Sequence, residues 1–193
     1  MHDHPGVIGV VLAGGGSRRM GRDKALLEWR GRPLLDQVRT RLWAAGCQAV
    51  VTSRAAPGCI ADVYPDRGPL GGIHAVLRSR PSVGYLVVPV DMPLLPIALL
   101  RGLIDSGRVH GHCYYRRSFL PCYLSGHPTL PGRLAQRLSR GDLALGGFLR
   151  ALHARALDGG DDAAFLNTNT PEAWRRATAL DASPPTLCKE IGL

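Results

Sequence analysis

Apolar positions in the first half of the chain form short continuous runs. They lie at residues 6–12 (GVIGVVL), 48–53 (QAVVTS), 59–64 (CIADVY) and 85–90 (YLVVPV). Short apolar runs that are rich in β-branched residues and bounded by turn residues are typical of buried strands. We therefore predict four strands in this half of the chain.

Two stretches between these runs have the signals of helices. Residues 33–46 open with Pro33 and close with Gly46, which suit the first turn of a helix and the position after its last turn. Residues 68–79 carry apolar side chains at helical spacing. Strands that are apolar throughout and alternate with helices indicate a parallel sheet covered on both faces. The pattern predicts a doubly wound, mostly parallel α/β fold.

The second half of the chain is less regular. Pro121 interrupts one apolar run and predicts a sheet edge or an irregularity there, because proline has no N–H to donate. Thr170 and Pro171 provide a cap and a first-turn proline for the last helix. The pattern predicts strands at 118–124 and near 163–166, and helices at 131–141, 142–152 and 169–180.

Length and composition favour one soluble domain. The chain has 193 residues, 45% of them hydrophobic, and a mean hydropathy of -0.01. No apolar run approaches the roughly 20 residues that span a bilayer, and the start, MHDHPG, lacks the features of a signal peptide. We expect a cytoplasmic protein with no membrane segment, one domain over residues 1–180, and a loosely held tail over 181–193.

The cysteines predict reduced thiols rather than disulfides. There are five, an odd number, and they form no C-x-x-C pair. A metal site at His110, His112 and Cys113 is an alternative, but no second ligand cluster stands at zinc spacing.

Charge makes one lysine stand out. The net charge is +9, from 24 basic and 15 acidic residues, and lysine occurs only at Lys24 and Lys189. An arginine-rich surface suits either nucleic acid or a phosphorylated ligand. Aromatic residues make up 6% of the chain and do not alternate with the arginines, so binding to nucleic acid is the remoter alternative.

The stretch LAGGGSRRMGRDKALL follows the first predicted strand and suggests a phosphate-binding loop. Arg22 and Asp23 stand where a Walker loop has Lys and Ser/Thr, and Arg19 stands where the dinucleotide pattern has its last glycine. Glycines nevertheless let backbone N–H groups approach an anion closely. Lys24 adds a cation, and Asp91 follows another strand, so both belong at the carboxyl edge of the sheet. Together they offer a cradle, a charge clamp and a magnesium ligand.

These motifs resemble the molybdenum cofactor guanylyltransferase family, within the glycine-loop nucleotidyltransferases. Residues 12–35 contain the family's L-A-G-G, R-M-G, D-K-x-L-L and G-x-P-L elements. Residues 66–73 (DRGPLGGI) are similar to its D…G-P-L-A-G stretch, with Gly71 in place of alanine. Residues 87–96 (VVPVDMPLLP) are similar to its strand ending in C-D-x-P, and residues 165–172 (FLNTNTPE) to its N-x-N-T-P-E. The motifs keep their order over most of the chain.

The resemblance implies a Rossmann-like nucleotidyltransferase fold and a role for each matching residue. The N-terminal half would bind GTP, and the C-terminal half the pterin acceptor. Asp66 would be the carboxylate that binds the base, since a carboxylate can accept from guanine N1–H and N2–H₂ together. The residue after the second strand is Thr52, where guanylyl members often have asparagine. The implied residues are Leu12, Ala13, Gly14 and Gly15 along the nucleotide, Arg18 and Lys24 at the triphosphate, Asp91 at Mg²⁺, and Asn167 and Asn169 at the acceptor.

The implied reaction moves GMP from GTP to molybdenum-carrying molybdopterin and releases pyrophosphate. Partners would be these substrates and client molybdoenzymes, with Mg²⁺ as cofactor and neither nucleic acid nor membrane involved. The alternatives are a cytidylyltransferase for the same cofactor, a sugar-phosphate nucleotidyltransferase, and a silent homologue that only delivers the cofactor.

Several of these residues also have simpler interpretations. Asp91 could cap the following helix, and Asp66 could be a turn residue before Gly68. Asn167 and Asn169 stand in a sequence that also suits a helix start. Arg116 and Arg117 could contact the second substrate or be solvated surface charges.

Overall fold

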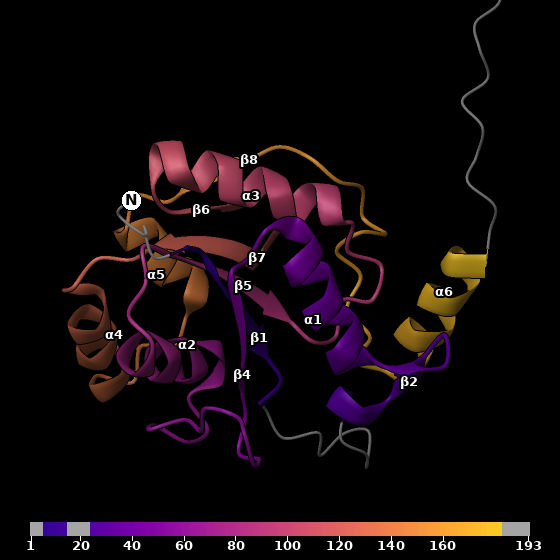
Figure 1. Ribbon diagram of the computed structural model, residues 1–193, viewed down its shortest axis with the longest axis horizontal. Coiled ribbons are helices and arrows are strands. Elements are labelled where there is room, and N and C mark those ends of the chain that lie inside the picture. The colour runs from indigo at the N-terminus through magenta and orange to yellow at the C-terminus, as the bar shows by residue number, and fades with distance from the viewer. Residues whose placement is uncertain (1–5, 15–23, 183–193) are drawn as a thin grey trace, which may run out of the picture.

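A computed structural model of the chain describes residues 6–14 and 24–182. Its central sheet has six strands (Figure 1). Every strand is parallel to its neighbours except β7, which is antiparallel to both of its own. The mostly parallel α/β prediction is therefore confirmed. The spatial order is β4 (Ala49–Ser53), β1 (Ile8–Leu12), β5 (Gly84–Pro89), β7 (Ser118–Ser125), β6 (Cys113–Tyr115) and β8 (Arg155–Leu157).

Helices cover both faces of this sheet, as Figure 1 shows. Because successive side chains of a strand point to opposite faces, Val11 and Val88 join one apolar core while Val10 and Val87 join the other. This is why β1 and β5 are apolar throughout. The first core lies under α1 (Leu34–Ala45) and α3 (Ile97–His110), and the second under α2 (Gly68–Ser79), α4 (Leu130–Ser139) and α5 (Leu145–Ala151).

Two predicted helix boundaries are confirmed by their hydrogen bonds. α1 ends at Gly46, whose φ of 102° is left-handed and whose N–H donates to the carbonyls of Leu42 and Trp43. The last helix, α6 (Pro171–Ala182), is capped by Thr170, whose Oγ1 accepts the N–H of Ala173 at 3.1 Å.

Two predicted strands are wrong. Residues 59–64 pair with β4 only through the isolated bridge between Ser53 and Ile60, and residues 163–166 form a turn. In both places a short apolar run resembles a strand in sequence, but at 163–166 the N–H of Leu166 donates to the Ala163 carbonyl at 3.1 Å and closes a turn instead. The last strand of the sheet is instead β8, which the sequence pattern did not predict, like α3 and β6.

Pro121 lies in an interior strand, so the prediction of an edge is wrong and that of an irregularity is confirmed. β7 runs between β5 and β6. The register against β6 shifts between Tyr114 and Tyr115, which pair with Cys122 and Ser118. Pro121 therefore falls in the bulge, where its missing N–H removes no bond from the ladder.

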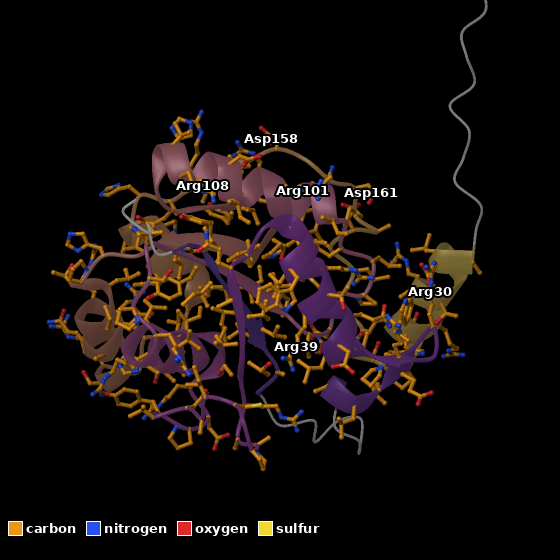
Figure 2. All side chains as sticks on the ribbon, viewed as in Figure 1. Arg30, Arg39, Arg101, Arg108, Asp158 and Asp161 are labelled. Atoms are coloured by element: carbon orange, nitrogen blue, oxygen red, sulfur yellow. The ribbon has the colours of Figure 1, made fainter. Side chains whose placement is uncertain are left out.

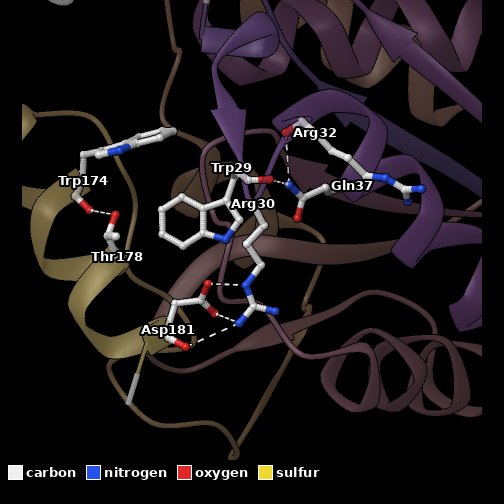
Figure 3. A network of polar contacts seen from close by, with 7 residues as sticks. All are labelled: Trp29, Arg30, Arg32, Gln37, Trp174, Thr178 and Asp181. Carbon is white, nitrogen blue, oxygen red and sulfur yellow. Dashed lines mark hydrogen bonds and ion pairs between the residues drawn. The ribbon is translucent and has the colours of Figure 1, made fainter. Parts of the chain in front are cut away.

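A short hairpin and the last helix pack together at one side of the molecule (Figures 1 and 3). η2 (Lys24–Leu26) leads into β2 (Glu28–Trp29), which pairs with β3 (Arg32–Pro33). The Trp29 ring meets Trp174 of α6 edge-on, with centroids 5.2 Å apart, and Arg30 makes two hydrogen bonds to the Asp181 carboxylate. Residues 181 and 182 of the predicted tail belong to α6, which continues to Ala182, and the rest of the predicted tail, 183–193, lies outside the described residues.

The cysteines that the structure describes are free thiols, and Cys188 lies outside the described residues. Burial raises the pKa of Cys47 to about 12 and that of Cys113 to about 11. In the described part of the chain His110, His112 and Cys113 do not form a group placed to hold a metal. His112 Nδ1 accepts the N–H of Ser125 at 3.1 Å, and the Cys113 thiol lies 3.4 Å from the carbonyl of Leu103. Over the described ranges, no helix is long and apolar enough to cross a membrane.

Buried His74 and half-buried His112 predict acid sensitivity. Burial lowers the pKa of His74, helped by the charge of Arg78, and burial likewise lowers the pKa of His112. As the pH falls through about 6.5, these histidines therefore become protonated in the unfolded chain while they stay neutral in the native state. We expect the free energy of unfolding to drop by up to about 1.4 kcal/mol per pH unit for each histidine.

Urea unfolding between about pH 5 and pH 8 checks this expectation. His74 packs edge-on against Tyr64 with centroids 5.1 Å apart, so His74→Phe keeps a ring in place while removing the titration. This variant should show a flatter pH dependence, and the same change at exposed His110 should not. An unchanged slope in His74→Phe would show that His74 contributes nothing to the acid sensitivity.

Candidate active site

The carboxyl ends of β1, β4 and β5 meet at one edge of the sheet. Leu12 pairs with Ser53 on one side and with Pro89 on the other. Beyond the strands, the N–H of Ala13 donates to the Ser53 carbonyl at 3.1 Å, and the N–H of Val90 donates to the Leu12 carbonyl at 3.1 Å. These bonds fix the point where the glycine-rich stretch leaves the sheet.

The predicted nucleotide loop starts at this edge. Leu12 and Ala13 are half-buried, and Gly14 is exposed next to the Ser53 carbonyl. Gly15 and Arg18 lie outside the described residues. Lys24 opens η2, and only its backbone is described. Exposed backbone beside three strand ends is what close approach to an anion requires.

Asp91 lies at the same edge, two residues after β5. It is half-buried in a turn, and its carbonyl accepts the N–H of Thr168 at 2.8 Å and the Thr168 hydroxyl at 3.1 Å. Capping of the next helix is the wrong interpretation, because α3 starts only at Ile97 and follows Pro96. Asp91 thus lies in a turn at the sheet edge rather than in a helix cap.

Two carboxylates precede α2, and they differ in their surroundings. Asp66 is exposed and left-handed, with φ 59°, as a turn residue would be. Asp62 is half-buried and accepts the Ser53 hydroxyl at 3.0 Å. Burial raises the pKa of Asp62, and the Ser53 hydrogen bond opposes that rise. The structure therefore brings Asp62, rather than Asp66, into contact with the end of β4.

Glycines in the first turn of α2 make room for this contact. A Cβ on Gly71 would lie 2.9 Å from the Tyr64 carbonyl and 3.2 Å from Asp62 Oδ2. A Cβ on Gly72 would lie well inside 3.0 Å of Ser53 Oγ and 3.2 Å from Leu12 Cδ2. The G-P-L-G-G stretch thus lets α2 approach the ends of β1 and β4.

Sequence reasoning missed Asp62 because residues 59–64 were assigned to a strand. The available signal was a second acidic residue, Asp62, in the segment that precedes the glycine pair Gly71 and Gly72. Thr52 is buried and its carbonyl accepts the N–H of Ile60 at 2.9 Å. Ser53 is therefore the residue of β4 that contacts Asp62.

The structure brings the predicted acceptor residues close to Asp91. Thr168, bonded to the Asp91 carbonyl, lies between exposed Asn167 and half-buried Asn169. The helix-start interpretation does not need either asparagine, because Thr170 caps α6.

Arg116 and Arg117 follow β6. Because β7 is antiparallel to both β5 and β6, β6 runs in the same direction as β5, and its carboxyl end lies at the same edge of the sheet. Arg116 pairs with Asp158 at 3.0 Å, and Arg117 pairs with Asp162. Other exposed arginines are spread over the hairpin, α1 and α3, as the labelled Arg30, Arg39, Arg101 and Arg108 show (Figure 2).

A divalent cation fits this site only if a substrate helps to bind it. Within residues 6–14 and 24–182, no group of three or more His, Cys, Asp or Glu is placed to hold a metal. Mg²⁺ usually takes one or two carboxylates, substrate phosphates and waters. Half-buried Asp91, at the same sheet edge as Leu12 and Gly14, could supply the carboxylate of that donor set.

Comparisons with known proteins agree with this geometry. Residues 9–155 match the MobA-like NTP transferase domain. The chain is 44% identical over 177 residues to the molybdenum cofactor guanylyltransferase of Xanthomonas euvesicatoria pv. vesicatoria, covering 87% of this chain and 92% of that protein. It is 32% identical over 202 residues to the protein of the same name from Serratia proteamaculans, covering 92% and 98%.

Solved structures share the fold. Molybdopterin-guanine dinucleotide biosynthesis protein A from Archaeoglobus fulgidus superposes with a TM-score of 0.74 at 22% identity, covering 90% of this chain and 98% of that one. Rv0371c from Mycobacterium tuberculosis, in complex with manganese, superposes with a TM-score of 0.63 at 24% identity, covering 92% and 100%. By domain match and by identity over most of its length, the chain belongs to the MobA-like NTP transferase family.

Proposed function

We propose that this protein transfers GMP from GTP to the terminal phosphate of molybdenum-carrying molybdopterin, forming the guanine dinucleotide cofactor and pyrophosphate. The observation that carries the proposal is the single sheet edge at which Gly14, Asp62, Asp91 and the Asn167–Asn169 segment gather. Relatives with the guanylyltransferase name support the choice of substrates.

The transfer needs no side-chain nucleophile. An oxygen of the acceptor phosphate forms a bond to the α-phosphorus of GTP. The bond from that phosphorus to the oxygen bridging to the β-phosphate breaks, and its electron pair leaves with pyrophosphate. The acceptor is already an anion, so positioning and charge neutralisation supply the catalysis.

Each predicted residue has a place in this scheme. Gly14 and Gly15 offer backbone N–H groups to the phosphates, and Arg18 and Lys24 balance their charge. Asp91 would hold Mg²⁺, which when bound shields the phosphate charges and orients the leaving group. Asn167 and Asn169 would bind the pterin beside Asp91. We place the reaction in the cytoplasm, with client molybdoenzymes as recipients of the product.

Pyrophosphate release tests the proposal. Purified protein is mixed with Mg²⁺, molybdenum-loaded molybdopterin and one NTP at a time. Release with GTP alone is the expected result. Release with CTP would keep the transfer chemistry but make the protein a cytidylyltransferase. Silence with every NTP would rule out this acceptor and direct the test to sugar phosphates.

The base-side carboxylate can be assigned by exchanging the base. The sequence predicts Asp66, while the contact with Ser53 supports Asp62. A carboxylate accepts both N–H groups of guanine, whereas an asparagine amide can donate to the 2-oxo group of xanthine. At the position that binds the base, Asp→Asn should lower kcat/KM for GTP by the equivalent of about 1–3 kcal/mol and should raise kcat/KM for XTP.

Asp62→Asn and Asp66→Asn serve as each other's control, because they are the same substitution four residues apart. Steady-state kcat/KM with GTP and XTP is the readout. A reversal of preference in one variant alone identifies the residue. If both variants kept the wild-type preference for GTP over XTP, neither Asp62 nor Asp66 would bind the base.

A further inference from the structure

We propose that Thr168 is a positioning residue that holds Asp91 in the geometry needed to bind the divalent cation. The inference rests on the proposed metal role of Asp91. Thr168 is 1% exposed and gives two hydrogen bonds to the same Asp91 carbonyl, one from its N–H at 2.8 Å and one from its hydroxyl at 3.1 Å. A buried hydroxyl and an N–H directed at one acceptor fix that peptide group in place.

Asp91 needs such support because of where it stands. β5 ends at Pro89 and α3 begins at Ile97, so Asp91 lies in the turn between two regular elements. The N–H of Val90 is bonded to the Leu12 carbonyl at 3.1 Å, which holds the side of the turn next to the strand. The two bonds from Thr168 hold the other side of this turn, and they come from a segment 77 positions further along the sequence.

Thr168 is itself held between two packed segments. On its N-terminal side, Phe165 packs against Tyr115 with ring centroids 5.5 Å apart. On its C-terminal side, Thr170 caps α6, and α6 is locked to the hairpin by Trp174 against Trp29 (Figure 3). The segment therefore has little freedom to shift, and its two donors are preorganised toward Asp91.

Of the two bonds to the Asp91 carbonyl, the Thr168 side chain supplies the one from its hydroxyl, and the backbone supplies the other. Thr168→Val keeps the volume and the backbone N–H but removes one of the two donors. The Asp91 turn then gains freedom, and its carboxylate spends less time in the binding geometry. Loss of such outer-shell partners typically lowers metal affinity 10–100-fold.

The test measures metal binding directly. Mn²⁺ is titrated into the full-length protein with GTP and without acceptor, free Mn²⁺ is followed by EPR, and a GTP-only titration is subtracted. We expect Thr168→Val to weaken Mn²⁺ binding about 10-fold or more, and Thr168→Ser to stay within about twofold of wild type. Should Thr168→Val not fold, Thr168→Ala removes the same hydroxyl and takes its place.

Thr178 provides the matched control. Its hydroxyl also donates to a backbone carbonyl, that of Trp174 at 3.0 Å (Figure 3), but this bond lies within α6 rather than between α6 and the Asp91 turn. Thr178→Val should bind Mn²⁺ as the wild type does. Equal weakening in Thr178→Val and Thr168→Val would overturn the inference, because the effect would then be one of general stability.

Asp91→Asn distinguishes a failure of the Thr168 role from a failure of the metal role of Asp91. If it abolishes Mn²⁺ binding while Thr168→Val binds normally, Thr168 does not position the ligand and the proposed function stands. If Asp91→Asn itself binds Mn²⁺ like the wild type, the metal assignment fails and the inference fails with it.

Discussion

Asp91→Asn is expected to lower kcat for GMP transfer by about 10²–10³-fold, the usual cost of removing one preorganised electrostatic group from an active site. Asparagine has the same shape, and the carbonyl that accepts both bonds from Thr168 remains. The loss would therefore come from the missing charge at the metal rather than from unfolding. Pyrophosphate release under saturating GTP and acceptor measures it.

Asp105→Asn is the matched control, because Asp105 is exposed on α3, away from the site edge. It should turn over at the wild-type rate. Near-normal turnover by Asp91→Asn would show that another group binds the cation. Partial recovery of Asp91→Asn at high Mn²⁺ would support a weakened rather than an abolished site.

Gly72→Ala is expected to destabilise the protein by about 1–3 kcal/mol and to weaken GTP binding. Overpacking a well-packed site typically costs that much. The added methyl would displace Ser53 Oγ, whose hydrogen bond to Asp62 is 3.0 Å long, and press on Leu12. Ser53, Asp62 and Leu12, which surround the proposed nucleotide site, would shift together. Urea unfolding and GTP titration by calorimetry give the two quantities.

Gly132→Ala provides a control of opposite sign. Gly132 is also helical, in α4, but a Cβ there would meet nothing within 4 Å. Alanine should raise stability by up to about 1 kcal/mol, because glycine loses more backbone freedom on folding, and GTP binding should be unchanged. If Gly72→Ala behaved like Gly132→Ala, close packing of α2 on Ser53 would not support the site.

The local pattern of the sequence predicts much of the fold. β1, β4 and β5 are short apolar runs, and a strand buried on both faces must be apolar at every position. α1 and α6 carry their own terminal signals in Gly46 and Thr170. The parallel sheet, the edge where its strands end and the places of the glycine loop and Asp91 follow from these runs alone.

The local sequence pattern does not predict contacts between distant segments. β7 lies inside the sheet despite Pro121, because a bulge against β6 makes room for a residue without an N–H. β8 has only three residues and exists because β6 offers it a partner. Such short strands form only where a partner strand is available, and their own residues do not predict that partner.

The same division applies to the site. Motif order along the chain predicts the family, which the comparisons confirm. It also predicts a phosphate-binding glycine loop, because close approach of the backbone to an anion favours glycine in one continuous stretch, and a metal ligand at Asp91. Tertiary structure decided that Asp62 meets Ser53, and that Thr168 reaches the Asp91 carbonyl across 77 positions of sequence. In each of these bonds the donor and acceptor stand on different segments, whose local patterns do not specify the contact, and only the folded chain brings them together.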